Sequence, residues 1–237
     1  MITEGKVSLK KTYPYSQELY TQGIELVSNQ KLLISSGRYQ HSRVGLYDLE
    51  DSSYQDLLYL SDNEFAEGIA LVGNSFWLLT YREGRAYRFD KNTLKYVETA
   101  NYTGEGWGLA YDKSRECLWM TSGNTFIQKR DPNTFELQKK VMVTVDGVPI
   151  SMLNELECVE GVLYANIWQT NIIVKLSPED GRILSRYDMT ELLEKLELNT
   201  DRYPTLNVLN GIAHMGGNRF MISGKFFPVL MEVELSE

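Results

Sequence analysis

Histidine, cysteine and long apolar runs are scarce in this chain of 237 residues. It holds two histidines, His41 and His214, and two cysteines, Cys117 and Cys158. Two histidines are too few for a zinc site built on histidine, and the cysteines form no CxxC motif for metal or redox chemistry. The cysteines lie in strand-like segments, where we expect buried free thiols, with a disulfide as the alternative. No segment approaches the roughly 20 apolar residues of a membrane-spanning helix.

The chain also lacks an excess of basic residues. It has 24 Lys and Arg against 32 Asp and Glu, a formal net charge of −8. Nucleic acids and anionic membranes bind through basic patches, so we expect neither as a partner. The start, Met1–Lys6, has no basic and apolar regions typical of a secretion signal, which favours a cytoplasmic protein unless a leader was removed. Length and composition fit a single domain over residues 1–237, and we expect a monomer.

The chain does contain a short sequence motif, here called the phrase, that recurs five times. A polar or aromatic residue is followed by Gly, or by Glu in the fourth copy, then by an aliphatic residue and a strand-like run. The phrase begins at Gln22, Glu67, Trp107, Asn154 and Asn210. The copies start roughly 40 to 55 residues apart, a period typical of four-stranded propeller blades.

Each copy continues as a meander of strands. A turn leads into a second strand, as in Val72–Tyr81, and Val159–Trp168 matches that segment without a gap. The third strand ends in Asp48, Asp90 or Asp131 in the first three copies, and turn residues then lead to a fourth strand. The sequence therefore predicts an all-β fold, a five-bladed β-propeller with four-stranded antiparallel blades.

Two segments depart from the repeat. Asp188–Leu196 has leucines at helical spacing and cap candidates at its start, which predicts one short helix between blades 4 and 5. The fifth copy ends near Met231–Leu235 after about three strands. We predict that Lys6–Tyr13, which alternates apolar and polar residues, supplies the missing outer strand. Closing the ring in this way removes exposed sheet edges.

The repeat also predicts where a site lies. Inner strands line the axis of a propeller, so side chains at one repeat position converge there. The first column holds the five residues that begin the phrase. The second column, at the end of the second strand, holds Ser36, Tyr81, Ser122–Gly123, Trp168 and Lys225. Scaffold positions agree among the copies but these columns do not, which indicates a site made of unlike parts.

The chemistry of these residues suits acid–base catalysis. A carboxylate among aromatic walls is desolvated and becomes a weaker acid, as a general base working near neutral pH requires. Carboxamides and an ammonium can stabilise a developing oxyanion. Tyr20 and Phe65, two residues before the first column, add aromatic faces that exclude water.

The same residues lie in motifs that resemble those of glutamine cyclotransferases of the plant and bacterial type. Each motif is short, but eight occur in the right order between residues 20 and 233. They are Tyr20–Ile24, Phe65–Ile69, Glu105–Leu109, Asp131–Phe135, Leu153–Glu157, Ala165–Trp168, Leu209–Ala213 and Ser223–Lys225. The resemblance implies a five-bladed propeller that converts N-terminal glutaminyl residues of peptides or proteins to pyroglutamyl with release of ammonia. It implies no catalytic zinc, and we expect no cofactor.

Carried over by position, the resemblance places the catalytic carboxylate at Glu67, with Asn154 and Lys225 as its polar companions. The substrate-binding residues that we predict from the resemblance and the columns are Gln22, Tyr20, Phe65, Tyr81, Trp107, Trp168 and Asn210. Tyr20 stands where the family commonly has Phe, and Tyr81 where it commonly has Trp. Both changes keep an aromatic face and add a hydroxyl that needs a partner.

Other interpretations remain open on the sequence. Trp107 and Trp168 could simply fill the axis, and Lys225 could be a surface cation. A lactonase-like propeller hydrolase would hold a divalent cation with Glu67, Asn154 and Asn210, although the lysine and the indoles argue against a cation there. A non-catalytic propeller that binds peptide N-termini is the third alternative.

Overall fold

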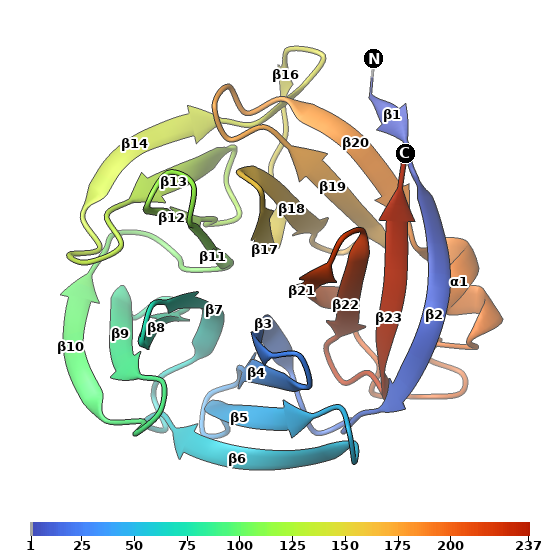
Figure 1. The fold of residues 1–237 in the computed structure, drawn as a ribbon, viewed down its shortest axis with the longest axis horizontal. Helices are drawn as coiled ribbons and strands as arrows, with labels where there is room; N and C mark the ends of the chain where they lie inside the picture. Colours follow the sequence, from blue (N-terminus) through green and yellow to red (C-terminus); the bar gives the residue numbers. More distant parts are fainter. Residues whose placement is uncertain (1) are drawn as a thin grey trace.

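Five antiparallel sheets surround a central axis in the computed structural model, which describes residues 2–237. Figure 1 shows the view down this axis. The innermost strands are β3 (Thr21–Ser28), β7 (Ala66–Val72), β11 (Leu109–Asp112), β17 (Leu153–Val159) and β21 (Leu209–Gly216). The five-bladed propeller is therefore confirmed.

The first three blades follow the predicted meander from the axis outward. Blade 1 continues through β4 (Lys31–Ser36), β5 (Arg43–Asp48) and β6 (Ser53–Tyr59). Blade 2 continues through β8 (Ser75–Thr80), β9 (Arg85–Asp90) and β10 (Tyr96–Asn101). Blade 3 continues through β12 (Cys117–Met120), β13 (Phe126–Arg130) and β14 (Leu137–Met142).

The N-terminal segment joins the last two blades. Blade 4 continues through β18 (Val162–Ile167), β19 (Ile172–Leu176) and β20 (Ile183–Asp188), and blade 5 through β22 (Arg219–Gly224) and β23 (Val229–Ser236). Strand β1 (Thr3–Glu4) pairs in parallel with β20, and β2 (Lys6–Pro14) pairs antiparallel with β23. The prediction that an N-terminal strand completes blade 5 is confirmed, and β1 adds a short fifth strand to blade 4.

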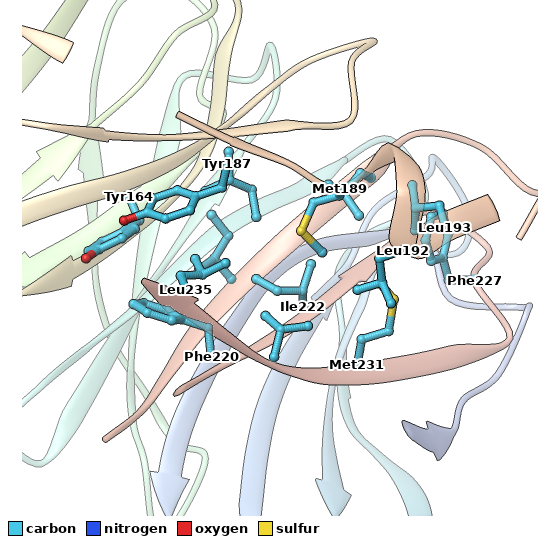
Figure 2. Packing of buried hydrophobic residues seen from close by; sticks show 14 of the residues in the cluster. Tyr164, Tyr187, Met189, Leu192, Leu193, Phe220, Ile222, Phe227, Met231 and Leu235 are labelled. Carbon is cyan, nitrogen blue, oxygen red and sulfur yellow. The ribbon is translucent and has the colours of Figure 1, made fainter. Parts of the chain in front are cut away.

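The predicted helix between blades 4 and 5 is α1 (Thr190–Lys195). Its buried residues Leu192 and Leu193 pack with Met189 into the apolar cluster that holds Phe227 and Met231 of blade 5. Figure 2 shows these side chains between the helix and the strands of the last blade. The helix thus covers apolar surface at the side of blade 5, and the site at the axis does not depend on it directly.

One element was not predicted. The short hairpin of β15 (Thr144–Val145) and β16 (Val148–Pro149) lies between blades 3 and 4. Its two-residue turn, Asp146–Gly147, has positive φ at both positions, +48° and +82°. Asp-Gly is the sequence typical of such a turn, so the signal was present, but the flanking strands are too short to show alternation.

Cys117 is buried and Cys158 half-buried, and both are free thiols. No helix within residues 2–237 is long and apolar enough to span a membrane.

Candidate active site

The recurrent phrase forms an irregularity in the inner strands. Where the inner strand pairs with the second strand, the register shifts between Thr21 and Gly23 in blade 1 and between Ala66 and Ile69 in blade 2. Blades 4 and 5 show the same shift at the same repeat position. A bulge breaks the alternation of a strand and re-aims a side chain. In these four blades the repeat thus directs one unlike residue out of the regular ladder.

The glycine of the phrase lets neighbouring inner strands meet. A Cβ on Gly68 would lie 2.6 Å from the backbone nitrogen of Leu109 in the next blade. Gly68 N–H instead donates to the carbonyl of Trp107, at 2.7 Å. This close approach fixes the position of Trp107 relative to Glu67, the residue before the glycine.

Nine of the ten predicted site residues surround one cavity of about 210 Å³. They come from all five blades: Tyr20, Gln22, Phe65, Glu67, Tyr81, Trp107, Asn154, Trp168 and Lys225. A cavity of this size accommodates one amino-acid side chain. The tenth predicted residue, Asn210, does not line it.

Glu67 is the carboxylate of this cavity and is only 5% exposed. Burial raises its pKa well above the usual range of a glutamate, while the charge of Lys225 opposes this effect and Glu105 and Glu83 add to it. Gln22 Nε2 donates to Glu67 Oε1 at 3.1 Å, the one hydrogen bond described for this carboxylate. A buried carboxylate with a raised pKa, open to a cavity, suits proton transfer near neutral pH.

Lys225 lies across the cavity and is also 5% exposed, so it is not a surface cation. Burial lowers its pKa, while the charge of Glu67 raises it. Its Nζ lies 4.7 Å from the centre of the Tyr20 ring, and the backbones of the two residues form a β-bridge between blades 5 and 1. None of the ion pairs described joins Lys225 to Glu67, so the ammonium can meet an anionic oxygen of a ligand.

The two asparagines of the first column have different surroundings. Asn154 lines the cavity, is 3% exposed, and its buried Oδ1 has no hydrogen-bond partner among the described residues. A buried acceptor without a donor is costly, so this atom calls for a donor from a ligand or water. Asn210 is fully buried, and its Nδ2 donates to Gln22 Oε1 and to the carbonyl of Thr21. The structure thus places Asn210 one layer behind the cavity wall rather than in it.

Aromatic rings form the remaining walls. Trp107 and Trp168 meet edge to face, with ring centres 5.6 Å apart. Phe65 lies 5.7 Å from Tyr81 and 6.1 Å from Tyr20. The hydroxyl that Tyr81 adds lies 3.1 Å from Arg82, which donates to it, so this departure from the family pattern has a partner. These rings give the cavity apolar walls that can enclose the aliphatic part of a ligand side chain.

Glu105, which lies two residues before Trp107, also contacts the site and was not predicted. Its Oε2 accepts a hydrogen bond from Trp107 Nε1 at 3.0 Å, and its Oε1 accepts one from Arg82 Nε at 3.0 Å. Partial burial raises the pKa of Glu105, but the hydrogen bonds from Trp107, Arg82 and Tyr81 leave it below the usual value. Glu105 therefore holds the Trp107 indole in place as an anion. The motif Glu105–Leu109 was the only signal, and it gives no direction for the ring nitrogen.

A cation site of the lactonase type does not fit these contacts. Asn210 directs its amide to Gln22 and Thr21, so it does not converge with Glu67 and Asn154 as a third ligand. Within residues 2–237 no group of three His, Cys, Asp or Glu side chains is arranged to hold a metal ion.

Comparison with known proteins gives consistent matches. A family model described as glutamine cyclotransferase matches residues 2–235. The chain is 28% identical over 235 residues to a glutaminyl-peptide cyclotransferase of Arabidopsis thaliana, covering 98% of this chain and 72% of that protein. The crystal structure of glutaminyl cyclase from Myxococcus xanthus matches with a TM-score of 0.87 and 29% identity, over 100% of this chain and 99% of the other. An aldose sugar dehydrogenase of Streptomyces coelicolor, at 12% identity and a TM-score of 0.63 over 99% of each chain, is similar in fold alone.

Proposed function

Because the chain belongs to the glutamine cyclotransferase family, we propose that it is a glutaminyl-peptide cyclotransferase. It converts the N-terminal glutaminyl residue of a peptide or protein to a pyroglutamyl residue and releases ammonia. The observation that carries this proposal is the single cavity in which the carboxylate of Glu67, the ammonium of Lys225 and the unpartnered amide of Asn154 meet between aromatic walls. Residues of one chain are enough to build this cavity, so the reaction needs no residue from a second copy, and we propose that the enzyme is a monomer.

The reaction is an intramolecular acyl transfer. The α-amine nitrogen of the substrate forms a bond to its own side-chain amide carbon, and the bond from that carbon to the amide nitrogen breaks. Glu67 accepts the proton that the amine loses and returns it to the departing nitrogen, which leaves as ammonia. The raised pKa of Glu67 brings it closer to that of an α-amine, which is about 8, so proton transfer in both directions is efficient.

The polar groups opposite Glu67 act on the amide oxygen. As the amine attacks, this oxygen gains negative charge, and Lys225 Nζ and the N–H groups of Asn154 stabilise it. Such donors are most effective in a cavity that excludes water, because charge interactions are stronger there. Asn154 Oδ1, which has no partner in the protein among the described residues, accepts an N–H of the substrate.

The aromatic walls select the conformer that cyclises. A free glutaminyl side chain samples many rotamers, and few of them bring the amine near the amide carbon. Trp107 and Trp168 on one side and Phe65 and Tyr81 on another confine the side chain. Holding the two reacting atoms together removes unproductive rotation and lowers the barrier.

A coupled ammonia-release assay tests the proposal. We expect ammonia from Gln-Phe and other peptides with N-terminal glutamine, with pyroglutamyl peptide identified by mass spectrometry, and no effect of a chelator. A peptide with an acetylated α-amine is the matched control, since a simple amidase would still release ammonia from it. Binding of Gln-Phe without ammonia release would favour a non-catalytic binding protein, and loss of activity with a chelator would favour a metal-dependent enzyme.

A further inference from the structure

Asn210 has a defined amide orientation. Its Nδ2 lies 3.0 Å from the carbonyl oxygen of Thr21, and a backbone carbonyl can only accept a hydrogen bond. The NH₂ group must therefore face β3. Its Oδ1 is buried without a described partner, so all described polar contacts of the Asn210 side chain are donated ones.

The orientation of Asn210 sets that of Gln22. The NH₂ group of Asn210 lies 3.1 Å from Gln22 Oε1, and Gln22 Nε2 lies 3.1 Å from Glu67 Oε1. Turning the Gln22 amide over would place two NH₂ groups against each other and a carbonyl oxygen against the Glu67 carboxylate. Both contacts are unfavourable, so one backbone carbonyl fixes the direction of the whole chain of hydrogen bonds.

We propose that Asn210 is a positioning residue that holds the Gln22 carboxamide with its NH₂ group toward Glu67. This inference deepens the proposed function and rests on it for its catalytic meaning. Asn210 does not line the cavity, so it acts on the reaction only through Gln22, which is itself 2% exposed.

The consequence for Glu67 is electrostatic. The groups whose charge acts on Glu67 are Lys225, Glu105 and Glu83, and Glu67 in turn acts on the hydroxyls of Tyr20 and Tyr102. Burial and the two glutamates favour the protonated form, and Lys225 opposes them. A hydrogen bond donated by Gln22 also favours the ionised form, which is the form that accepts the substrate proton.

A double-mutant cycle of Asn210→Leu and Gln22→Met tests this role. The pKa of Glu67 is measured from the acid limb of kcat/KM and, independently, by ¹³C NMR of the carboxyl group, assigned with Glu67→Gln. We expect Gln22→Met to raise the pKa of Glu67 by about one unit, since one hydrogen bond to a charged group is lost. Asn210→Leu should raise it by a similar amount, since Gln22 is then free to turn its NH₂ group away from Glu67. The double variant should show the shift of Gln22→Met alone. Additive shifts, or no shift in Asn210→Leu, would overturn the proposal.

Asn166→Leu is the matched control. Asn166 is a buried asparagine, 1% exposed, on β18, and its Oδ1 accepts from Gly211 N–H, the residue after Asn210. No described hydrogen bond links Asn166 to Gln22. Removing the Asn166 amide therefore disturbs the same region but leaves the hydrogen bonds between Asn210, Gln22 and Glu67 in place. We expect the pKa of Glu67 to stay at the wild-type value in Asn166→Leu, and an equal shift there would assign the effect to general damage.

The role of Asn210 can still be tested if Asn210→Leu does not fold or if the wild-type protein has no cyclase activity. If Asn210→Leu does not fold, the side-chain ¹⁵N resonances of Gln22 and Asn210 are followed in the wild type, with Gln22 assigned by Gln22→Met and Asn210 by its contacts with Gln22. Both should move with the Glu67 carboxyl titration, and an Asn210 or Gln22 resonance that does not respond to this titration would overturn the proposal. The NMR titrations need no turnover, so a wild-type protein without cyclase activity would refute the proposed function and still decide the role of Asn210.

Discussion

Two buried glutamates near the axis, Glu67 and Glu155, differ in what satisfies them. Both are almost inaccessible, at 5% and 0% exposed, and burial raises the pKa of both well above the usual value. Glu155 Oε2 accepts from Ile212 N–H at 2.7 Å, and its Oε1 accepts from Ile24 N–H at 3.4 Å. Glu67 has one described hydrogen bond, from a side chain, and faces the cavity.

The difference shows that a raised pKa does not by itself identify a catalytic acid. Glu155 stands where most copies of the repeat have glycine, and its carboxylate bridges β21 and β3, whose N–H groups face the axis. Glu155 thus satisfies backbone N–H groups of the inner strands near the axis. Glu67 is available for chemistry because its second oxygen and the cavity are left to a ligand.

The largest effect is expected when Glu67 is changed to Gln. The variant keeps the shape of the side chain but cannot accept the proton, so kcat/KM should fall by about a hundred- to ten-thousandfold. The ammonia-release assay measures this, and the melting temperature should not fall. Full activity of Glu67→Gln would remove the distinction between the two glutamates.

Glu155→Gln should reverse this pattern. A glutamine can offer one oxygen to Ile212 or Ile24 but turns an NH₂ group toward the other backbone N–H. We expect a loss of about 1–3 kcal/mol in the free energy of unfolding, since one buried donor loses its acceptor. Urea denaturation measures the loss, and folded Glu155→Gln should keep kcat within a few-fold of wild type. A large loss of kcat in a stable protein would contradict the structural role.

A third axial acid, Glu157, makes stability depend on pH. It accepts hydrogen bonds from His214 N–H and Cys158 N–H, yet burial raises its pKa to about 7. The unfolded chain releases this proton near pH 4.3, so the folded state binds more protons in between and stability falls as pH rises from about 4.3 to about 7. In urea denaturation, Glu157→Gln should show a smaller fall over this range. Parallel curves for the two proteins would refute the assignment.

The smallest effect is expected at Glu105. Glu105→Ala frees the Trp107 indole, and losing one such hydrogen bond should lower kcat about three- to tenfold. It also removes a negative charge that raises the pKa of Glu67, so the acid limb of the pH profile should move to lower pH. Glu83→Gln is the matched control, because the charge of Glu83 also raises the pKa of Glu67 but Glu83 has no described bond to Trp107. It should move the acid limb to lower pH without lowering kcat.

The fold was predictable because the sequence repeat has the length of one propeller blade and each copy begins with the same recognisable motif. A repeat of the length of one blade fixes which residues share a level on the axis, and this brought Glu67, Asn154 and Lys225 together although they come from different blades. The closing strand was predictable for a related reason, since the fifth copy lacked a partner for its last strand.

The direction of individual side chains was not predictable. Asn210 occupies the same repeat position as Glu67, but its amide turns toward β3 instead of the cavity, because the carbonyl of Thr21 accepts from it. Bulges decide such directions, and no alternation survives across them. The roles of Glu105 and Glu155 depend on where a ring nitrogen and two backbone N–H groups lie in space, which spacing along the chain does not reveal.

The pairing of β2 with β23 has a consequence for how the ring closes. Strand β2 pairs with β23, which lies more than 200 residues further along the sequence, and the bridge between Tyr20 and Lys225 likewise joins blades 1 and 5. The cavity is therefore complete only when blade 5 has folded and closed the ring, because Lys225 comes from the last blade and Glu67 from the second.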